Sequence, residues 1–262
     1  MKNRFLALLI CAILVFSIIP FGKNIKASQT NNNAKQVNTP EQMAAVMREK
    51  ANNNTARMKG KITQSQVNET IKQKLIVKTR DEIENTYGAN SVYYYTVGNY
   101  QILFYDSAEE AKNACEKLKK DLPGTTIFQD IPITLKEAAK DNGSDEVAAY
   151  DGIKKMGMDQ LKEEKDSWKN KSAKVAVIDS GINVDHQWFK NRLDRENSIN
   201  LALDEGNEDD KTKPAYSDTK QGHGSHVAGI ITQATPEEVQ VMAIRVFSAL
   251  GTASYATVSY TH

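Results

Sequence analysis

Residues 174–181 (KVAVIDSG) constrain the fold of this chain more than any other segment. Their run of Val, Ala and Ile is typical of a strand that a parallel sheet buries on both faces. The strand ends in the carboxylate of Asp179, and the Ser-Gly pair that follows favours a turn. Because open α/β sheets build their sites at the carboxyl ends of parallel strands, we expect an α/β fold with Asp179 at such a site.

A second segment, residues 222–229 (GHGSHVAG), places a histidine where a helix begins. The apolar residues after it indicate the helix, and the glycines on either side of His223 let its ring project from the helix mouth. A carboxylate that accepts a hydrogen bond from one imidazole nitrogen leaves the other nitrogen free to take a proton from a nucleophile. Asp179 and His223 therefore suit the acid and the base of a Ser-His-Asp hydrolase site.

The neighbouring side chains Ser225 and His226 receive structural interpretations. A zinc site formed by His223 and His226 is excluded by their spacing, because the helical zinc motif needs histidines at i and i+4 with a glutamate between them. We expect His226 to be a structural histidine with a satisfied ring, and Ser225 to be a helix residue rather than the nucleophile. A strand-end aspartate can also do no more than cap the next turn, but the combination of the two segments favours the catalytic role for Asp179.

In this order and spacing, the strand VAVIDSGI and the later run HGSHVAG resemble the subtilisin-like (subtilase, peptidase family S8) serine proteases. The resemblance covers residues 74–262, and its specific motifs begin at Lys174. It implies a subtilisin-like parallel-sheet catalytic domain, incomplete in this chain, that hydrolyses protein or peptide substrates with a Ser-His-Asp triad. In that triad Asp179 would be the orienting acid and His223 the general base.

The family's nucleophilic serine lies in a Gly-Thr-Ser-Met-Ala-like turn far downstream, and its oxyanion-hole asparagine also lies downstream of the histidine. Neither is found before His262. Without them only weak residual catalysis is expected, so the chain is predicted not to hydrolyse peptides by itself. We interpret it as the amino-terminal part of a secreted serine endopeptidase, either as a truncated sequence or as the product of an interrupted gene.

Two alternatives from other classes remain. The first is a non-catalytic protein, a propeptide joined to a remnant, which acts as a folding aid or as an inhibitor of another subtilase. The second takes the strand that ends at Asp179 as part of a nucleotide-binding or phospho-acceptor domain. The predicted export, the HGSHVAG run and the lack of a phosphate-cradling glycine loop after the strand all disfavour this second alternative.

The sequence after the histidine motif predicts a binding edge. Residues 239–246 have the pattern of an apolar strand. The resemblance implies that Gly251, Thr252 and Ala253 follow it as an edge that pairs with the extended backbone of the substrate. In such β-augmentation the main-chain hydrogen bonds bind and the side-chain pockets select.

We expect no cofactor and no metal ion. Many subtilases have a His-Pro-Asp-Leu run with a calcium-liganding aspartate, but here His186 is followed by Gln-Trp-Phe. The helix after His223 also lacks the inserted loop with an asparagine that would complete that calcium site. The acidic stretch from Asp204 to Asp210 does not have the spacing of an EF-hand, and we interpret it as a solvated surface loop.

The first residues have the pattern of a secretory signal peptide. Lys2 and Arg4 precede an apolar run from Phe5 to Phe21, and Ala27 offers a small residue for signal peptidase. We expect residues 1–27 to be removed, leaving a secreted protein in the extracellular space or at the cell surface, without stable membrane association. An uncleaved membrane anchor is the alternative, because the run has the shortest length that spans a bilayer.

Charge and cysteine content narrow the function further. The 34 basic and 33 acidic side chains give a net charge of +1, so no basic field favours binding to nucleic acid. Cys115 is the one cysteine that the exported chain would keep, so no internal disulfide can form. The helical spacing of the apolar residues around Cys115 predicts that it is a core residue.

Four segments follow the predicted signal peptide. Residues 28–72 are a polar leader, which we expect to be mobile apart from one short helix that begins at Thr39 and Pro40. Residues 73–135 are a compact α+β domain and residues 136–152 a linker with the processing site. The N-terminal part of the catalytic domain occupies residues 153–262.

The compact domain alternates strand and helix patterns. Strands are predicted at residues 74–78, at 92–105 as two strands that turn at Gly98-Asn99, and at 125–128; helices are predicted from Asp81 to Tyr87 and from Ala108 to Lys120. This β-α-β-β-α-β order is ferredoxin-like. The domain resembles the inhibitory propeptide of secreted subtilases. The resemblance implies that it assists folding of the catalytic domain and lays its C-terminal tail through the active-site cleft until it is cleaved.

Overall fold

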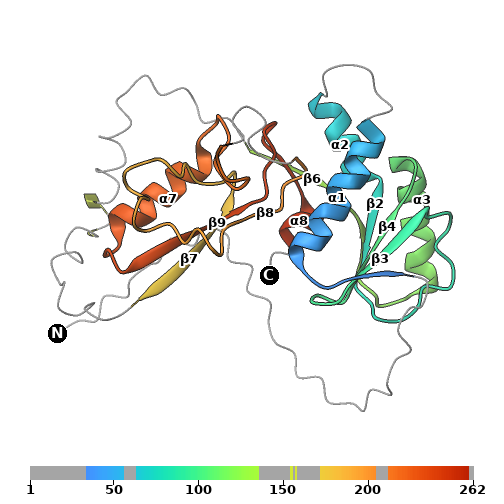
Figure 1. The fold of residues 1–262 in the computed structure, drawn as a ribbon. Helices are drawn as coiled ribbons and strands as arrows, with labels where there is room; N and C mark the ends of the chain where they lie inside the picture. Colours follow the sequence, from blue (N-terminus) through green and yellow to red (C-terminus); the bar gives the residue numbers. More distant parts are fainter. Residues whose placement is uncertain are drawn as a thin grey trace, which may run out of the picture.

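A computed structural model of the chain describes residues 34–55, 63–135, 154–155, 157, 172–204 and 212–259. It shows a mixed α/β protein whose two parts lie side by side (Figure 1), here named the N-terminal region (residues 34–135) and the C-terminal region (residues 172–259). The predicted signal peptide and the predicted processing linker lie outside the described residues. None of the described helices is long and apolar enough to cross a membrane.

The secondary structure falls into two series. In the N-terminal region the elements are β1 (Lys35–Val37), α1 (Pro40–Thr55), α2 (Gln64–Lys72), β2 (Lys74–Val77), β3 (Ser91–Tyr95), β4 (Tyr100–Phe104), α3 (Ala108–Asp121), β5 (Ile127–Gln129) and β6 (Pro132–Thr134). In the C-terminal region they are β7 (Ala173–Asp179), β8 (Ile199–Asn200), α7 (His223–Ala234), β9 (Val239–Arg245), β10 (Thr252–Ser254) and α8 (Tyr255–Ser259).

The N-terminal region is built on a five-stranded sheet in the order β1-β3-β4-β2-β5. The parallel pair β1–β3 adds to three antiparallel pairs, and α3 packs against one face. Ser107 and Glu110 form a capping box that begins α3, and Cys115 is buried beneath this helix, as predicted. The four predicted strands and the helix predicted from Ala108 are therefore confirmed.

The helix predicted from Asp81 to Tyr87 is wrong, because this segment is an irregular loop between β2 and β3. Asn85 accepts a hydrogen bond from the backbone amide of Tyr87 through its side-chain oxygen, which closes a local turn. Tyr87 and Gly88 then take positive φ angles of 52° and 92°, which no helix allows. A local side-chain bond has thus replaced the first turn of the expected helix.

The expectation of a mobile polar leader is wrong for the described residues 34–55 and 63–72. The predicted start of a helix is confirmed, since the hydroxyl of Thr39 accepts a bond from the amide of Gln42 and α1 begins at Pro40. The helix is 16 residues long, however, and it buries Met43, Ala44 and Met47. These few apolar side chains lie on one helix face, so a segment that is polar on average still contributes to a core.

The C-terminal region contains a three-stranded parallel sheet in the order β7-β9-β8. Its register pairs Asp179, at the end of β7, with Arg245, at the end of β9. Helix α7 covers one face, where Val177, Val241 and Ala243 share a core cluster with Ala228. The strands predicted at residues 174–179 and 239–246 are confirmed, and they bring the predicted acid to the carboxyl edge of the sheet.

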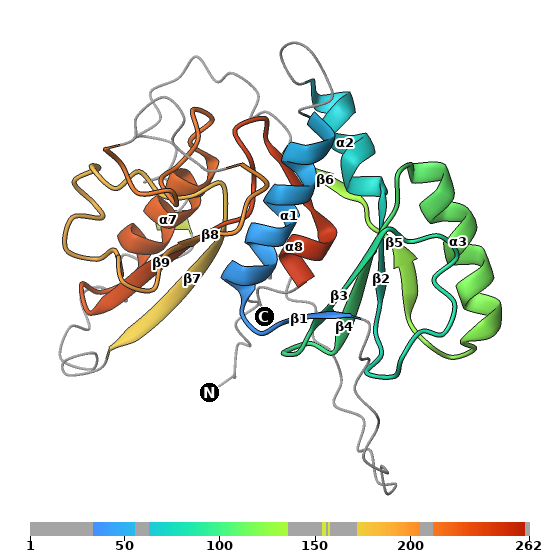
Figure 2. The ribbon, with the colours of Figure 1, turned by 45° about the vertical axis from the view of Figure 1, so that its right-hand side comes forward.

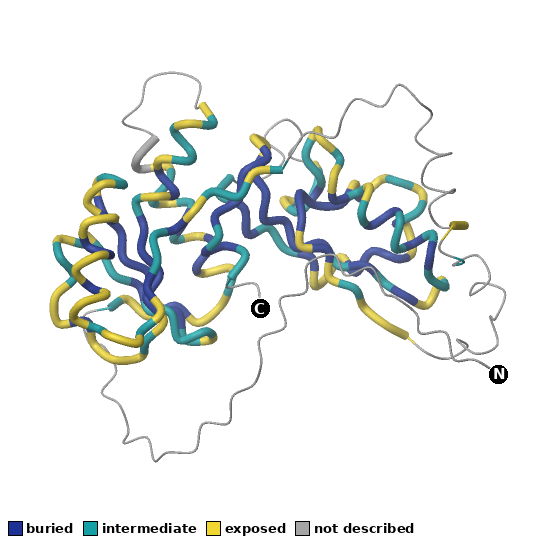
Figure 3. The backbone as a smooth tube through the Cα atoms, turned by 180° about the vertical axis from the view of Figure 1, so that it is seen from behind, coloured by how far each residue is buried: buried dark blue, intermediate teal, exposed yellow. Residues whose placement is uncertain are grey.

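The two regions meet in a shared core rather than at a wet boundary. Strand β6, at the end of the N-terminal region, pairs antiparallel with β10. One hydrophobic cluster also includes residues of α1 and the five-stranded sheet together with Val246, Phe247 and Ala256 of the C-terminal region. The buried backbone accordingly continues through the segment where the regions join (Figure 3).

Candidate active site

The carboxylate of Asp179 is buried at the carboxyl end of β7. Its Oδ1 accepts a hydrogen bond of 2.6 Å from the backbone amide of Ser180, which fixes the orientation of the carboxylate. Its backbone carbonyl accepts a bond of 2.8 Å from the amide of Val246, so the neighbouring strand end is tied to the same residue. The side chain therefore has a defined position at the edge where the parallel strands end.

His223 is the first residue of α7, and its ring faces Asp179. Nδ1 lies 2.8 Å from Oδ1 and 2.9 Å from Oδ2 of the carboxylate. The preceding Gly222 caps the helix with a left-handed φ of 69°, a conformation that glycine adopts without strain. The ring is 43% exposed, and among the described residues its Nε2 has no hydrogen-bond partner. A neutral ring that donates from Nδ1 to Asp179 keeps Nε2 free to accept a proton.

The close approach of α7 to the end of β7 depends on Gly224. A Cβ at this position would lie 2.1 Å from the carbonyl oxygen of Gly181, closer than any real side chain is found. The amide of Gly224 donates to Oγ of Ser180 at 2.9 Å. The glycine after the histidine is therefore required by backbone packing that sets the distance between His223 and Asp179.

Asp218 connects the two motif segments, and its role was not predicted from the sequence. Its Oδ1 accepts a bond of 2.6 Å from Oγ of Ser180, and its Oδ2 accepts bonds from the amide and the hydroxyl of Ser225. Carboxylates favour the amino ends of helices, where amide groups lack partners. An aspartate just before the predicted helix was the signal that could have revealed this residue.

The two side chains next to His223 in α7 differ in their environment. Ser225 is a helix residue, as predicted, and its oxygen also accepts a bond of 2.8 Å from the amide of Asn183. His226 is exposed, and its ring has no hydrogen bond within the described part of the chain. The expectation of a satisfied structural ring is therefore wrong: at this point of the helix the His226 side chain faces solvent rather than the sheet.

The far end of α7 is held by a buried arginine. Arg192 donates to the carbonyl oxygens of Val239, at 2.9 Å, and Thr232, and to the hydroxyl of Thr235 at 2.7 Å. Cations favour the carboxyl ends of helices, where carbonyl groups lack partners. Burial lowers the pKa of the Arg192 guanidinium, although such a group stays charged at neutral pH. Both ends of the helix that carries His223 are thus fixed.

The sequence-predicted binding edge is occupied by another part of the chain. Strand β10, which includes Thr252 and Ala253, pairs with β6, and Ala253 lies opposite Ile133. The amide of Leu135 donates to the carbonyl oxygen of Gly251 at 2.9 Å. These are main-chain hydrogen bonds of the kind that an extended peptide makes when it adds to a sheet edge.

Gly251 also places this edge relative to the histidine. A Cβ on Gly251 would lie 2.9 Å from both terminal atoms of the Gln221 side chain, two residues before His223. Since Leu135 binds Gly251, the C-terminal end of the described tail lies beside the loop that precedes His223. The edge, the loop and the start of α7 are therefore neighbours.

The first residue of the acidic stretch is not solvated as predicted. Asp204 forms an ion pair of 2.6 Å with Arg245, whose side chain is 2% exposed. The other carboxylate oxygen of Asp204 accepts a bond of 2.6 Å from the amide of Ala249, in the connection that leads to β10. Sequence analysis missed this pair, because a charge at the end of an apolar strand does not reveal its partner. The remaining stretch, residues 205–210, lies outside the described residues.

A few further residues had been considered for metal binding. The ring of His186 packs against Trp188 and Phe189, with ring centroids 4.9 Å and 5.4 Å apart. Within the described ranges, no group of three or more His, Cys, Asp or Glu side chains is arranged to hold a metal ion. Elsewhere, the pKa of Asp194 is lowered by hydrogen bonds from Lys174 and Asn197, which stabilises the turn before β8.

Comparison with known protein families matches residues 170–260 to the Subtilase family. A comparison of the chain with curated proteins found no match. The matched segment contains both Asp179 and His223, together with the three residues of the predicted edge. This family relates the segment to serine peptidases and implies proteins as substrates. Residues 170–260 are thus a subtilase family (peptidase S8) domain at the C-terminal end of the chain.

Proposed function

We propose that the C-terminal region is part of a subtilisin-like serine endopeptidase in which Asp179 is the orienting acid and His223 the general base. The observation that carries this proposal is the contact between Nδ1 of His223 and both carboxylate oxygens of Asp179. It occurs at the carboxyl end of a parallel strand, where α/β folds hold their reactive groups. The family match supplies the reaction class.

The chemistry follows from the two ends of the imidazole ring. Asp179 accepts the proton of Nδ1 in a hydrogen bond, so Nε2 carries a lone pair. Nε2 would take the proton of a serine hydroxyl as that oxygen attacks a peptide carbonyl, and would then deliver the proton to the leaving amine. Asp179 would stabilise the intermediate imidazolium. Among the described residues no serine bonds to Nε2, so the proposal assigns the nucleophile to a serine outside this set.

The N-terminal region is proposed to be an inhibitory propeptide with a ferredoxin-like fold. Support comes from the strand pairing of β6 with β10, which fills the edge proposed for substrate. The four-strand order β3-β4-β2-β5 is the order expected of such a fold, with a loop in place of its first helix. A tail held in this way would keep the peptidase silent until the protein has been secreted and the 136–152 linker cleaved.

The test uses the complete reading frame that contains these residues, expressed with its native leader. We expect a fluorophosphonate probe to label one serine and an internally quenched peptide to be hydrolysed once the N-terminal region is released. Replacing His223 by alanine should abolish both signals, because no other group can take the proton of the serine. The His226→Ala variant is a matched control on the same helix and should retain both.

Two results would contradict this function. Hydrolysis that survives the replacement of His223 would show that another base acts. A complete frame that is neither labelled nor active would favour the non-catalytic alternative, in which the protein assists or inhibits another subtilase.

A further inference from the structure

Helix α1 lies between the two sheets, beside α8 (Figure 2), although its sequence is polar on average. The strand before it, β1, pairs in parallel with β3 and so joins the helix to the five-stranded sheet. The helix then extends from that sheet toward β8 in the C-terminal region, a placement that Figures 1 and 2 both show. It is therefore positioned to contact both regions at once.

The polar contact across the boundary is made by Arg48. Its guanidinium Nη1 donates to the backbone carbonyl oxygens of Asn200, at 3.4 Å, and Ala202, at 3.2 Å. These carbonyls belong to β8 and the residues that follow it, where Leu201 and Ala202 are fully buried. A charged donor that binds two backbone acceptors recognises a shape of the main chain rather than one side chain.

The apolar contact is made by the same helix face. Met43 and Met47 are 0% and 2% exposed and belong to the core cluster that contains Leu201, Val246 and Phe247. Unbranched methionine side chains adapt to irregular surfaces, which suits a helix that packs on two different sheets. The methionines and Arg48 thus act on one surface of the C-terminal region.

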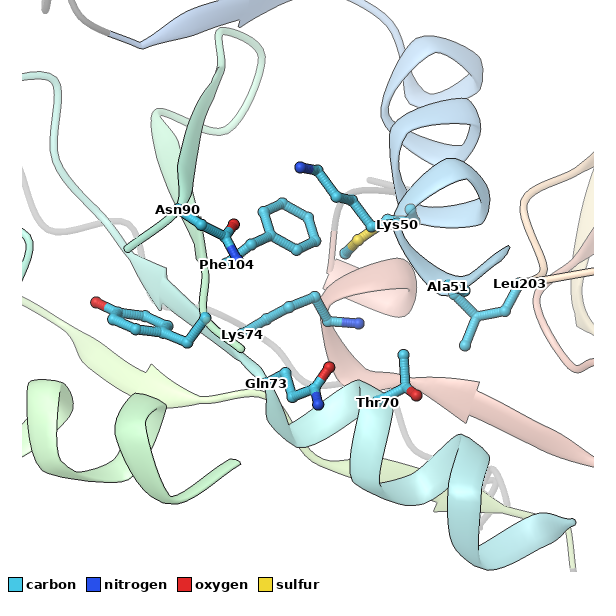
Figure 4. Close-up of a pocket in the computed structure, with 10 residues that line it drawn as sticks. Lys50, Ala51, Thr70, Gln73, Lys74, Asn90, Phe104 and Leu203 are labelled. Atoms are coloured by element: carbon cyan, nitrogen blue, oxygen red, sulfur yellow. The ribbon is translucent and has the colours of Figure 1, made fainter. Parts of the chain in front are cut away.

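A small cavity shows how closely the three layers approach one another. It has a volume of about 30 Å³ and is lined by Lys50 and Ala51 of α1, by Lys74 and Phe104 of the sheet, and by Leu203. Leu203 approaches this space from the side of the C-terminal region (Figure 4). A cavity of this size holds about one water molecule, so the packing around α1 is nearly complete.

This contact is separate from the tail. The tail binds through β6 and the edge strand β10, whereas α1 binds the carbonyls that follow β8. We propose that α1, through Met43, Met47 and Arg48, is a clamp that holds the N-terminal region on the peptidase domain independently of the tail. The inference rests on the proposed function. Its consequence is that cleavage within residues 136–152 frees the tail but leaves the inhibitor attached until α1 lets go.

Amide hydrogen exchange of the full chain tests the clamp, because each contact has its own reporter amides. The amide of Leu201 donates to the carbonyl of Arg245 at 2.7 Å and reports on the clamp surface, while the amide of Leu135 reports on the tail. We expect Arg48→Ala to speed exchange at Leu201 about tenfold or more, as hydrogen bonds from a charged donor are lost. Exchange at Leu135 should remain as in the unmodified chain.

Two further variants make the result decisive. Met47→Ala removes packing without touching the hydrogen bonds and should also speed exchange at Leu201. Glu49→Ala changes an exposed neighbour on the same helix and should leave both reporters unchanged. The clamp is overturned if Arg48→Ala and Met47→Ala behave like Glu49→Ala, or if they release the tail reporter as fast as the clamp reporter.

The same experiment separates the clamp from the proposed function. If Leu135 and Tyr255 exchange freely in the unmodified chain, the tail does not occupy the edge, and the inhibitory propeptide fails. A protected Leu201 that responds to Arg48→Ala would still support the contact of α1 in that case.

Discussion

Replacement of Gly224 by alanine is expected to destabilise the C-terminal region by about 3 kcal/mol and to separate His223 from Asp179. The new Cβ would lie 2.1 Å from the carbonyl oxygen of Gly181 and 3.1 Å from its carbonyl carbon and amide nitrogen. All of these are backbone atoms directly after β7, so no flexible side chain can move aside. Helix α7 must shift as a whole, and His223 begins that helix.

Urea unfolding, followed by the signals of the C-terminal region, measures the loss. Gly229→Ala is the matched control, because it makes the same change in the same helix. Its Cβ would lie 3.2 Å from the Trp188 ring, which can adjust by a few tenths of an ångström. Alanine also favours a helix interior by about 0.5–1 kcal/mol over glycine. Equal unfolding midpoints for the Gly224 variant and the unmodified chain would show that the close packing of α7 on β7 is wrong.

Removal of the Asp130 carboxylate is expected to cost about 3–5 kcal/mol and to weaken the junction between the two regions. Asp130 is fully buried and pairs with Lys74 at 3.1 Å, whose side chain is 4% exposed. The same carboxylate accepts bonds from Oγ of Ser254 at 2.5 Å and from the amide of Ala256 at 3.0 Å. Asp130→Ala would leave a buried ammonium without a counter-charge and the start of α8 without an acceptor.

Two variants interpret that loss. Asp106→Ala removes an exposed carboxylate from the same region and should change the unfolding free energy by less than about 0.5 kcal/mol. The double variant Lys74→Met with Asp130→Ala should recover part of the loss, because no unpaired charge remains. Amide exchange at Ala256 should increase in both Asp130 variants. An Asp130→Ala variant as stable as the Asp106 control would contradict the buried ion pair.

The elements that the sequence predicted well are those with a regular apolar pattern. The strand that ends at Asp179 and the helix that contains Cys115 have such patterns, and both form as expected. The glycines around His223 carried a second kind of information, because their spacing reflects the close approach of two backbones. Pattern and spacing together were enough to place the candidate acid and base.

The failures have local or long-range causes that a linear pattern does not contain. The helix expected from Asp81 to Tyr87 lost to a turn closed by the Asn85 side chain. Helix α1 was undervalued because polar composition hid one apolar face, although Met43 and Met47 are spaced one helical turn apart. The acceptors of Arg48 lie 152 and 154 residues away along the chain, so only the folded structure reveals them.

The central claim is that Asp179 sets the tautomer of His223, and nitrogen-15 NMR of the histidine rings tests it in the chain as it stands. At a pH where the ring is neutral, we expect the proton of His223 on Nδ1 and an unprotonated Nε2, because Nδ1 lies within 2.9 Å of both carboxylate oxygens. Asp179→Asn should move the proton to Nε2, since a carboxamide can donate to Nδ1.

The His223→Ala spectrum assigns the signals, and Asp185→Asn serves as the control, because it removes a surface carboxylate that pairs only with Lys213 in the described structure. The account predicts the Nδ1–H tautomer in the unmodified chain and in the Asp185 variant, and the opposite tautomer in the Asp179 variant. A ring protonated at Nε2 in the unmodified chain would contradict it, because His223 could then not act as the base.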